Sequence, residues 1–504
     1  MITSEERKTA RPITRILSEL AWQLIPPGAY LAVMLRYFPH RNTFWIYADE
    51  GFNVMKGLLV ERGYALYSQI WSDQPPLFTY LLAILYRWNG ESIYASRLLV
   101  LLFSCLLVWG FVQYLRLAWG NAAALAGVIL VILLPHFPTL SAAALIGQPS
   151  LAMAMVSMLA LAGWHKRHKR FFLVLSAVAL GISLLFKLYT AFLAPIFVIG
   201  LVTSEYFFLD KQDNGWRKLS PALIWSLTFL IFTLLAGVIA VGPGNISQLI
   251  LPHFAASQAD LSGETQIYPI TFYLRESWAI LLLAILGIGY AFQQRRWLMC
   301  YPIAWMACAA LILLNTRPVW FHHQMLITLP AAQLAGGAAA DTLHLLHRAI
   351  RSPSSLGKSW VWLGSGIVAL LLVLATRPAQ AISQFETPGA AATEQRAPFE
   401  DRVMRKINQY AERTNWMVTD LPMFAFRAGI PVPPNLAVIS GKRFVSGALT
   451  EETIIETVRE YSPEQVLIGR FELPRLEQSL LENYTLVLER KQELKLYIRK
   501  DLLR

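Results

Sequence analysis

Long apolar segments, each close to the thickness of a membrane, constrain this chain more than any other feature. A helix needs about 20 mostly apolar residues to cross a bilayer. The chain is 55% apolar and only 15% charged, with a mean hydropathy of +0.44. In water, such a chain could not cover its surface with polar groups, so we expect a polytopic membrane protein. The segments lie near residues 16–38, 98–116, 121–138, 149–164, 171–186, 188–203, 221–241, 277–293, 298–315, 319–340 and 359–376.

The basic residues between these segments indicate an orientation. Residues 1–376 contain 26 lysines and arginines but 15 acidic residues, and the bases gather in alternate loops. Cytoplasmic loops carry such an excess, so we expect about eleven spans, a cytoplasmic N-terminus and location in the plasma membrane. Basic loops fall on one side only if residues 75–89 do not cross the membrane. We expect them to form an interfacial helix, because they are too short to cross. Bases spread between spans do not form a nucleic-acid-binding face, so no nucleic-acid partner is expected.

The chain after residue 376 has a different composition and is expected to lie outside the cell membrane. It contains 17 acidic and 18 basic residues, and helix-like and strand-like segments alternate along it. We predict helices at 399–413, 451–461 and 473–481, and strands at 415–419, 435–440, 465–469, 485–490 and 494–499. The expected domains are therefore a membrane domain of residues 1–376 and a small extracytoplasmic α/β domain of residues 377–504.

The first outer loop, residues 39–97, holds acidic side chains beside aromatic ones. Asp49 and Glu50 follow an aromatic run and begin a short predicted helix, which Gly63 ends, and Asp73 precedes two prolines. Carboxylates at a membrane surface can act as a general base or hold a divalent cation. The alternative is that Asp49 and Asp73 only cap helices.

The order of several motifs in this loop resembles a known family. Asp49-Glu50, then GYALY at 63–67, DQPPLFTY at 73–80 and GESIYASRLL at 90–99 are similar to GT-C glycosyltransferases of the protein-O-mannosyltransferase and aminoarabinose-transferase type. Weaker similarity continues through ALGISLLFKLY at 179–189, residues 316–337 and WMVTDLPMFAFRAG at 416–429. The resemblance implies an all-α membrane domain of GT-C type with a small α/β domain at its C-terminus.

The resemblance also implies roles for single residues. Asp49 matches the catalytic aspartate of the family, and Glu50 is grouped with it as catalytic, with orientation or capping as its alternative. Asp73 matches an acidic metal ligand found in some members, and His253 in ILPHFAAS matches a histidine near the metal, with a purely structural role as its alternative. The matches for binding of the donor phosphate are Arg97, Lys187 and Arg317, and for Lys187 and Arg317 the alternative is an interfacial position.

The implied reaction transfers a sugar from a polyprenyl-phosphate donor to a hydroxyl of a protein, lipid or glycan acceptor. Asp49 would take the hydroxyl proton, and a divalent cation of unknown identity would stabilise the departing phosphate, with inversion at the anomeric carbon. Two positions depart from the family: Gln74 replaces a lysine and Gln148 replaces an aspartate before proline. Both departures argue against an aminoarabinose transferase. His322 and His323 are expected to line a cavity or the interface.

Three other functions remain open from the sequence. A lipid or glycan flippase would need inverted repeats and charges in the middle of spans, and neither is evident. A non-catalytic scaffold with the same fold is compatible with Gln74 and Gln148. A polymerase or ligase that uses a lipid-linked oligosaccharide is a further enzymatic alternative.

Overall fold

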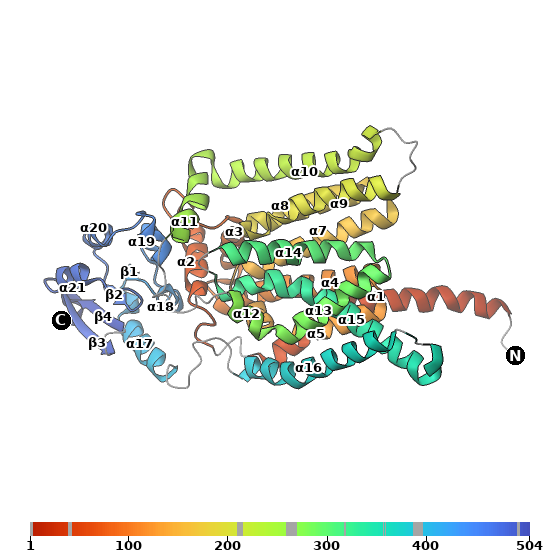
Figure 1. Cartoon of the computed structure of the whole chain (residues 1–504). Coiled ribbons are helices and arrows are strands. Elements are labelled where there is room, and N and C mark those ends of the chain that lie inside the picture. Colours follow the sequence, from red (N-terminus) through yellow and green to blue (C-terminus); the bar gives the residue numbers. More distant parts are fainter. Residues whose placement is uncertain are drawn as a thin grey trace.

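The protein is a bundle of long helices with a small mixed domain at one end. The computed structural model describes residues 4–38, 43–208, 215–258, 270–316, 319–355, 357, 359–386, 397–490 and 494–504. Figure 1 shows the N-terminus at one end of the bundle and the C-terminal domain at the other.

The long helices of the bundle occupy the predicted apolar segments. They are α1 (Ser4–Tyr37), α4 (Ile93–Ala118), α5 (Asn121–Ile132), α7 (Gly147–Arg167), α8 (Arg170–Phe186), α9 (Leu193–Phe208), α10 (Gly215–Val241), α13 (Trp278–Gln293), α14 (Cys300–Asn315), α15 (Met325–Arg351) and α16 (Ser359–Glu386). Their bounds differ from the predicted ones at several ends: α1 begins earlier, and α15 starts after the short helix η4 (Phe321–Gln324).

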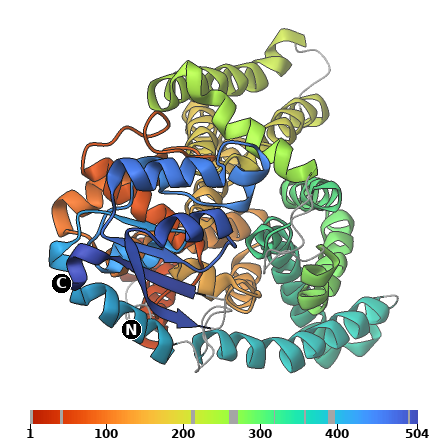
Figure 2. The ribbon, with the colours of Figure 1, turned by 90° about the vertical axis from the view of Figure 1, so that its left-hand side faces the viewer.

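Membrane crossing is supported most directly by four of these helices. By length and composition, the described parts of α4, α10, α14 and α16 are long and apolar enough to cross a membrane, so the count of eleven stays a prediction. The side chains of Leu230, Leu234 and Ile239 on α10 are exposed, as expected for a helix that faces lipid. Figure 2 looks from the C-terminal domain and shows the helices in an arc from α10 to α16.

Shorter helices fill the end of the bundle that faces the C-terminal domain. They are α2 (Asp49–Glu61), α3 (Leu77–Asn89), α6 (Phe137–Ala142), α11 (Ile246–Gln258) and α12 (Ile270–Glu276). The chain leaves α2 through Gly63, whose φ of +95° favours glycine. Ser92 then begins α4, because its side chain accepts the backbone N–H of Ala95. The predicted short helices at residues 49 and 75–89 are thus present, packed against each other.

The C-terminal domain is a four-stranded sheet covered by helices. The strand order is β1 (Met417–Thr419), β2 (Gln465–Ile468), β4 (Leu494–Arg499) and β3 (Tyr484–Arg490), with β1 parallel to β2 and the other pairs antiparallel. Its helices are α17 (Ala397–Gln409), α18 (Pro422–Arg427), α19 (Gly441–Val445), α20 (Glu451–Tyr461) and α21 (Pro474–Leu480).

Two sequence predictions for this region differ from the structure. The strand predicted at 435–440 is wrong: Pro433 and Pro434 directly before it begin a short 3₁₀ turn, Pro434–Leu436, and irregular chain follows. Helix α16 continues to Glu386, so the predicted domain boundary at residue 376 falls inside a helix. The bounds of the two predicted domains, 1–376 and 377–504, stay a prediction.

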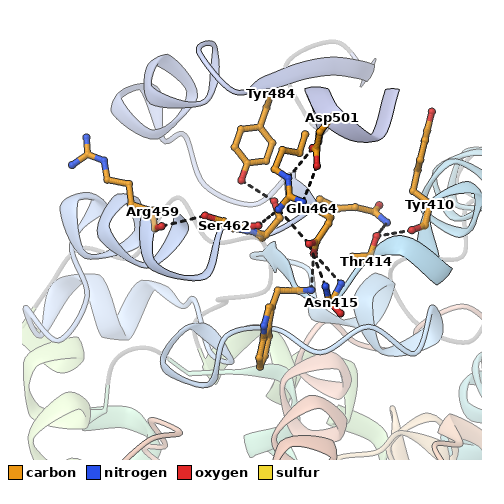
Figure 3. Close-up of polar contacts among 12 residues, drawn as sticks. Tyr410, Thr414, Asn415, Arg459, Ser462, Glu464, Tyr484 and Asp501 are labelled. Atoms are coloured by element: carbon orange, nitrogen blue, oxygen red, sulfur yellow. Dashed lines mark hydrogen bonds and ion pairs between the residues drawn. The ribbon is translucent and has the colours of Figure 1, made fainter. Parts of the chain in front are cut away.

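A polar network around Glu464 connects the ends of three strands of the sheet (Figure 3). Its carboxylate accepts the backbone N–H groups of Asn415 and Trp416 at 2.8 and 3.1 Å, just before β1. It also pairs with Arg499 at the end of β4, 3.2 Å away, and Arg499 in turn pairs with Asp501. These contacts join three strands that lie far apart in the sequence, so their role is structural.

The C-terminal domain packs directly on α2, α3 and the residues just before α2. Residues of α2, α3, α18 and the sheet share one hydrophobic core, and the ring of Phe424 lies 4.7 Å from that of Phe44. The Arg427 guanidinium donates to the carbonyls of Thr43 and Phe44. Gly51 allows this close approach, because a Cβ there would lie 2.7 Å from the backbone N of Met423.

Substitution of Gly51 tests how much the docking depends on this contact. Gly51→Ala should lower the free energy of unfolding by about 1–3 kcal/mol, because the backbone of Met423 must move away. Gly28→Ala on α1 is the matched control, since a Cβ there meets nothing within 4 Å, and it should be neutral or slightly stabilising. Thermal unfolding of the purified protein measures both, and equal melting temperatures would contradict the docking contact.

Candidate functional site

A cavity of about 480 Å³ lies between the end of the helix bundle and the C-terminal domain. It is formed by α2, the turn before α3, the start of α7, the end of α8, α11, η4 and α19. Its polar lining consists of Asp49, Asn53, Lys56, Asp73, Gln74, Gln148, Lys187, Tyr189, His253, Thr316, His322, His323, Ser440, Lys442 and Arg470. The rest of the wall is mostly apolar, with Leu140, Leu145, Ile146, Leu151 and Leu188 among its members.

Asp49 lies in the first turn of α2 with its side chain exposed to the cavity. The residue before it, Ala48, caps the helix, and no side-chain cap bond is present at the starts of α2 and α3. The described structure therefore does not support the capping interpretation of Asp49 and Asp73. Within the described residues, the Asp49 carboxylate has no hydrogen bond or ion pair, which leaves it accessible to a ligand.

Asp73 lies beside two basic side chains from other parts of the chain. Lys442 of α19 places its Nζ 3.3 Å from Oδ2 of Asp73, and Nε2 of His253 in α11 is 3.7 Å from the same atom. Burial alone would raise the pKa of Asp73, but the nearby cations, chiefly Lys442, lower it to about 2. Asp73 is thus ionised at neutral pH.

His253 links Asp73 to Lys442. Its Nε2 donates to the backbone carbonyl of Asp73 at 3.1 Å, which leaves Nδ1 as the acceptor for Lys442 Nζ at 3.3 Å. Burial and the charge of Lys442 lower the pKa of His253, in agreement with a neutral ring. The sequence placed Asp73 and His253 together as a pair, and the structure brings them together.

Lys187 and Lys56 add two further cations to the cavity. Nζ of Lys187, directly after α8, donates to Nε2 of His322 at 2.8 Å. Burial, together with repulsion from Lys442, lowers the pKa of Lys187 to about 7. Lys56 is buried on α2, where Nζ donates to the Ser72 hydroxyl at 3.3 Å. The cations outnumber the carboxylates Asp49 and Asp73, so the cavity favours an anionic ligand.

Glu50 and Arg97 lie outside the cavity, in a fully buried ion pair. The Arg97 guanidinium donates to both carboxylate oxygens of Glu50 at 2.8 and 2.9 Å and to the carbonyl of Thr43. Glu50 also accepts the N–H groups of Ile46 and Ala144. Burial opposes ionisation of Glu50, but Arg97 and these donors hold its pKa below the ordinary value.

This geometry favours an orienting role for Glu50, which the sequence left open as an alternative, and keeps Arg97 apart from the cavity. Both are 0% exposed, and their charges satisfy each other, so their assignment as catalytic and phosphate-binding residues stays a prediction. We infer that this ion pair positions Asp49, because it fixes the adjacent residue Glu50 against α4 and against the chain before α7.

The remaining sequence predictions have mixed outcomes. Arg317 lies outside the described residues, although the adjacent Thr316 lines the cavity. His322 and His323 line the cavity, as expected. The two departures, Gln74 and Gln148, also line it, and neither amide oxygen nor amide nitrogen of the buried Gln148 has a hydrogen-bond partner in the described protein.

Lys56 and Lys442 are site residues that the sequence reading missed. Lys56 follows Asp49 by seven residues, and this helical spacing places both on one face of α2, so periodicity could have found it. Lys442 follows Asp73 by 369 positions, and no local motif surrounds it. Only the docking of the C-terminal domain brings it to the cavity.

The predicted divalent cation does not fit this arrangement. Among the described residues, no group of three or more His, Cys, Asp or Glu side chains is placed to hold a metal ion. The Lys442 ammonium lies 3.3 Å from both predicted ligands, Asp73 and His253, and a second cation there would be repelled.

Comparison with known proteins supports the resemblance that the motifs indicated. Residues 73–237, about a third of the 504 residues, match the family of dolichyl-phosphate-mannose-protein mannosyltransferases. This match begins at Asp73, so the Asp49-Glu50 motif precedes it. No curated protein sequence matches the chain significantly.

Solved structures show the same fold over nearly the whole chain. ArnT from Cupriavidus metallidurans bound to undecaprenyl phosphate has a TM-score of 0.58 at 13% identity, over 95% of this chain and 98% of that chain. The apo state of ArnT gives a TM-score of 0.58 at 15% identity, with the same coverage. The oligosaccharyltransferase AglB from Archaeoglobus fulgidus, in complex with an inhibitory peptide and a dolichol-phosphate, gives 0.56 at 12% identity, over 90% and 70% of the two chains.

These findings show the fold and a family likeness over about a third of the chain. At these identities the likeness establishes the fold, and the predicted resemblance to GT-C glycosyltransferases of the protein-mannosyltransferase and ArnT type is confirmed. The apolar helices and this fold point to a multi-pass membrane protein.

The buried ion pair can be tested by single and double substitution. Glu50→Ala and Arg97→Ala should each lower the free energy of unfolding by about 3–5 kcal/mol, because each leaves an uncompensated buried charge. The double variant Glu50→Leu/Arg97→Met should lose less than either single variant. Denaturant unfolding in detergent measures all three. A single variant that keeps wild-type stability but loses enzymatic activity would instead support a direct catalytic role.

The pKa of Lys187 predicts a pH dependence for anion binding. Only protonated Lys187 attracts an anion, so binding of sulfate, whose charge stays constant in this range, should be strongest below about pH 7 and weaken as the pH rises above it. A bound anion stabilises the ammonium and moves the midpoint upward. In Lys187→Arg the charge persists, so affinity should stay nearly constant up to about pH 9. Titrations at several pH values test this, and identical profiles for the two proteins would remove Lys187 from the anion site.

Proposed function

We propose that the protein is an integral membrane glycosyltransferase. It transfers a sugar from a polyprenyl-phosphate donor to an acceptor hydroxyl on the extracytoplasmic side. The observation that carries the proposal is the cavity itself, in which the accessible carboxylate of Asp49 faces a set of lysines at the end of an apolar helix bundle. ArnT and AglB, which share the fold, are described with a bound polyprenyl phosphate.

The proposed orientation rests on where the loop charges lie. Helix α7 begins at the cavity with Gly147 and ends at Arg167, and its 21 residues span about 30 Å. The basic turn 166–170 is therefore at the opposite end from the cavity. Since basic loops favour the cytoplasm, the cavity and the C-terminal domain would face outward, and the N-terminus would be cytoplasmic.

In the proposed reaction, Asp49 takes the proton from the acceptor hydroxyl as the oxygen attacks the anomeric carbon of the donor. The bond between that carbon and the phosphate oxygen breaks, and the polyprenyl phosphate leaves with the electron pair. Lys187 and Lys56 stabilise the negative charge on this phosphate. The apolar residues Leu140, Leu151 and Leu188 would contact the first isoprene units of the donor. A single displacement of this kind inverts the anomeric configuration.

The electrostatics of the cavity bear on the alternatives. A flippase must take up its lipid on one side and release it on the other, whereas the charged residues that line the cavity lie at one end of the helices. A non-catalytic scaffold would not need an accessible carboxylate beside buried cations, each of which is costly to desolvate. The acceptor class, whether protein, lipid or glycan, is left to experiment.

Transfer of labelled sugar in membranes tests the proposal. Membranes with wild-type protein should transfer sugar from a polyprenyl-phosphate donor pool, and Asp49→Asn at equal expression should lower the rate about 100-fold or more, because the general base is lost. Asp401→Asn, an exposed residue of α17, is the matched control and should keep the wild-type rate. Equal transfer by the Asp49 variant would exclude Asp49 as the base. Lack of transfer by every protein would favour the scaffold or flippase.

A further inference from the structure

Lys442 occupies the centre of a three-residue contact made by three distant segments. It belongs to α19 of the C-terminal domain, while Asp73 belongs to the first outer loop and His253 to α11. Its Nζ lies 3.3 Å from Oδ2 of Asp73 and 3.3 Å from Nδ1 of His253. The side chains of Lys442 and Asp73 are only 19% and 13% exposed, so water screens the pair weakly.

These two acceptors are the residues that sequence comparison suggests as metal ligands. A divalent cation between them would require the ammonium to leave, and the buried ammonium would then lack its carboxylate partner. The neighbouring lysines Lys56 and Lys187 also line the cavity and would repel an added cation. The structure therefore places the ammonium of Lys442 where the resemblance to the family suggests a metal ion.

We propose that Lys442 serves as the built-in cation of this site and binds the phosphate of the donor in place of a divalent metal. The proposal rests on the proposed function, because it names a binding residue for that same reaction. An ammonium has three N–H donors, of which Asp73 and His253 account for two, and Lys442 also lines the cavity. The third donor can make a charge-assisted bond to a phosphate oxygen.

In this arrangement Asp73 and His253 are positioning residues. Their contacts hold the flexible lysine side chain in one place and balance its charge, so it need not be ordered when the phosphate binds. Because Lys442 comes from the C-terminal domain, the phosphate site is complete only when that domain is docked on α2. The domain thereby contributes directly to the site and does more than cover it.

Binding of undecaprenyl phosphate to the purified full-length protein in detergent tests the proposal without any need for turnover. Wild-type protein should bind with the same affinity in EDTA and in added Mg²⁺ or Mn²⁺. Lys442→Met, which keeps the length of the side chain, should bind at least about tenfold more weakly in EDTA, because a charge-assisted bond is lost. Lys442→Ala opens the space between Asp73 and His253, so added Mn²⁺ should restore part of its affinity.

Controls separate folding from binding. Lys406→Ala in α17 removes a lysine of the same domain that bonds Gln409 within its own helix, and it should bind like wild type. Lys442→Arg should retain most of the affinity, and the melting temperature of each variant shows whether it is folded.

Each outcome bears on the proposal. Loss of wild-type binding in EDTA with recovery in Mn²⁺ would overturn it in favour of a metal site. Wild-type affinity of Lys442→Met in EDTA would also overturn it. If neither wild type nor Lys406→Ala binds the phosphate at all, the proposed function fails and this inference fails with it.

Discussion

The buried contact between Glu50 and Arg97 is the interaction on which the position of the candidate site depends. It joins the start of α2 to the first turn of α4, and the same carboxylate accepts the backbone N–H of Ala144 before α7. Two segments of the cavity wall, α2 and the chain before α7, are thus held to α4 by one side chain. An ion pair without solvent has little freedom to change geometry, so Asp49, the next residue, is held at the cavity edge.

The cavity has an apolar part and a cationic part. A polyprenyl-phosphate donor, which has an apolar chain and an anionic headgroup, would need both. Apolar residues from the helix bundle line one part of its wall, and lysines from α2, the end of α8 and α19 line another. The lysines come from separate segments, and their mutual repulsion is relieved by Asp73 and by neutral histidines. An anionic headgroup on an apolar chain satisfies both parts. This match is the physical basis of the proposed reaction and of the role inferred for Lys442.

Local patterns predicted the elements that depend on local forces. The short helix at Asp49, the helix at 451–461 and the hairpin at 484–499 follow from periodicity and turn residues, and the structure contains them. The strand predicted at 435–440 failed because the turn that begins at Pro434 extends into it, despite its apolar pattern. Glu50 and Arg97 were assigned to chemistry because motif position does not reveal burial, and their ion pair became evident only with the packing of α2 against α4.

The sequence by itself determined the membrane class, the helical segments and the placement of Asp49, Asp73, Lys187 and His253 at one end. These depend on apolar length and loop charge, which are properties of neighbouring residues. Tertiary structure alone decided that Lys442 reaches Asp73 across 369 positions and lies where a metal ion was expected. The reason is physical: a charge is neutralised by whichever partner packing brings within about 4 Å, and sequence separation does not limit that choice.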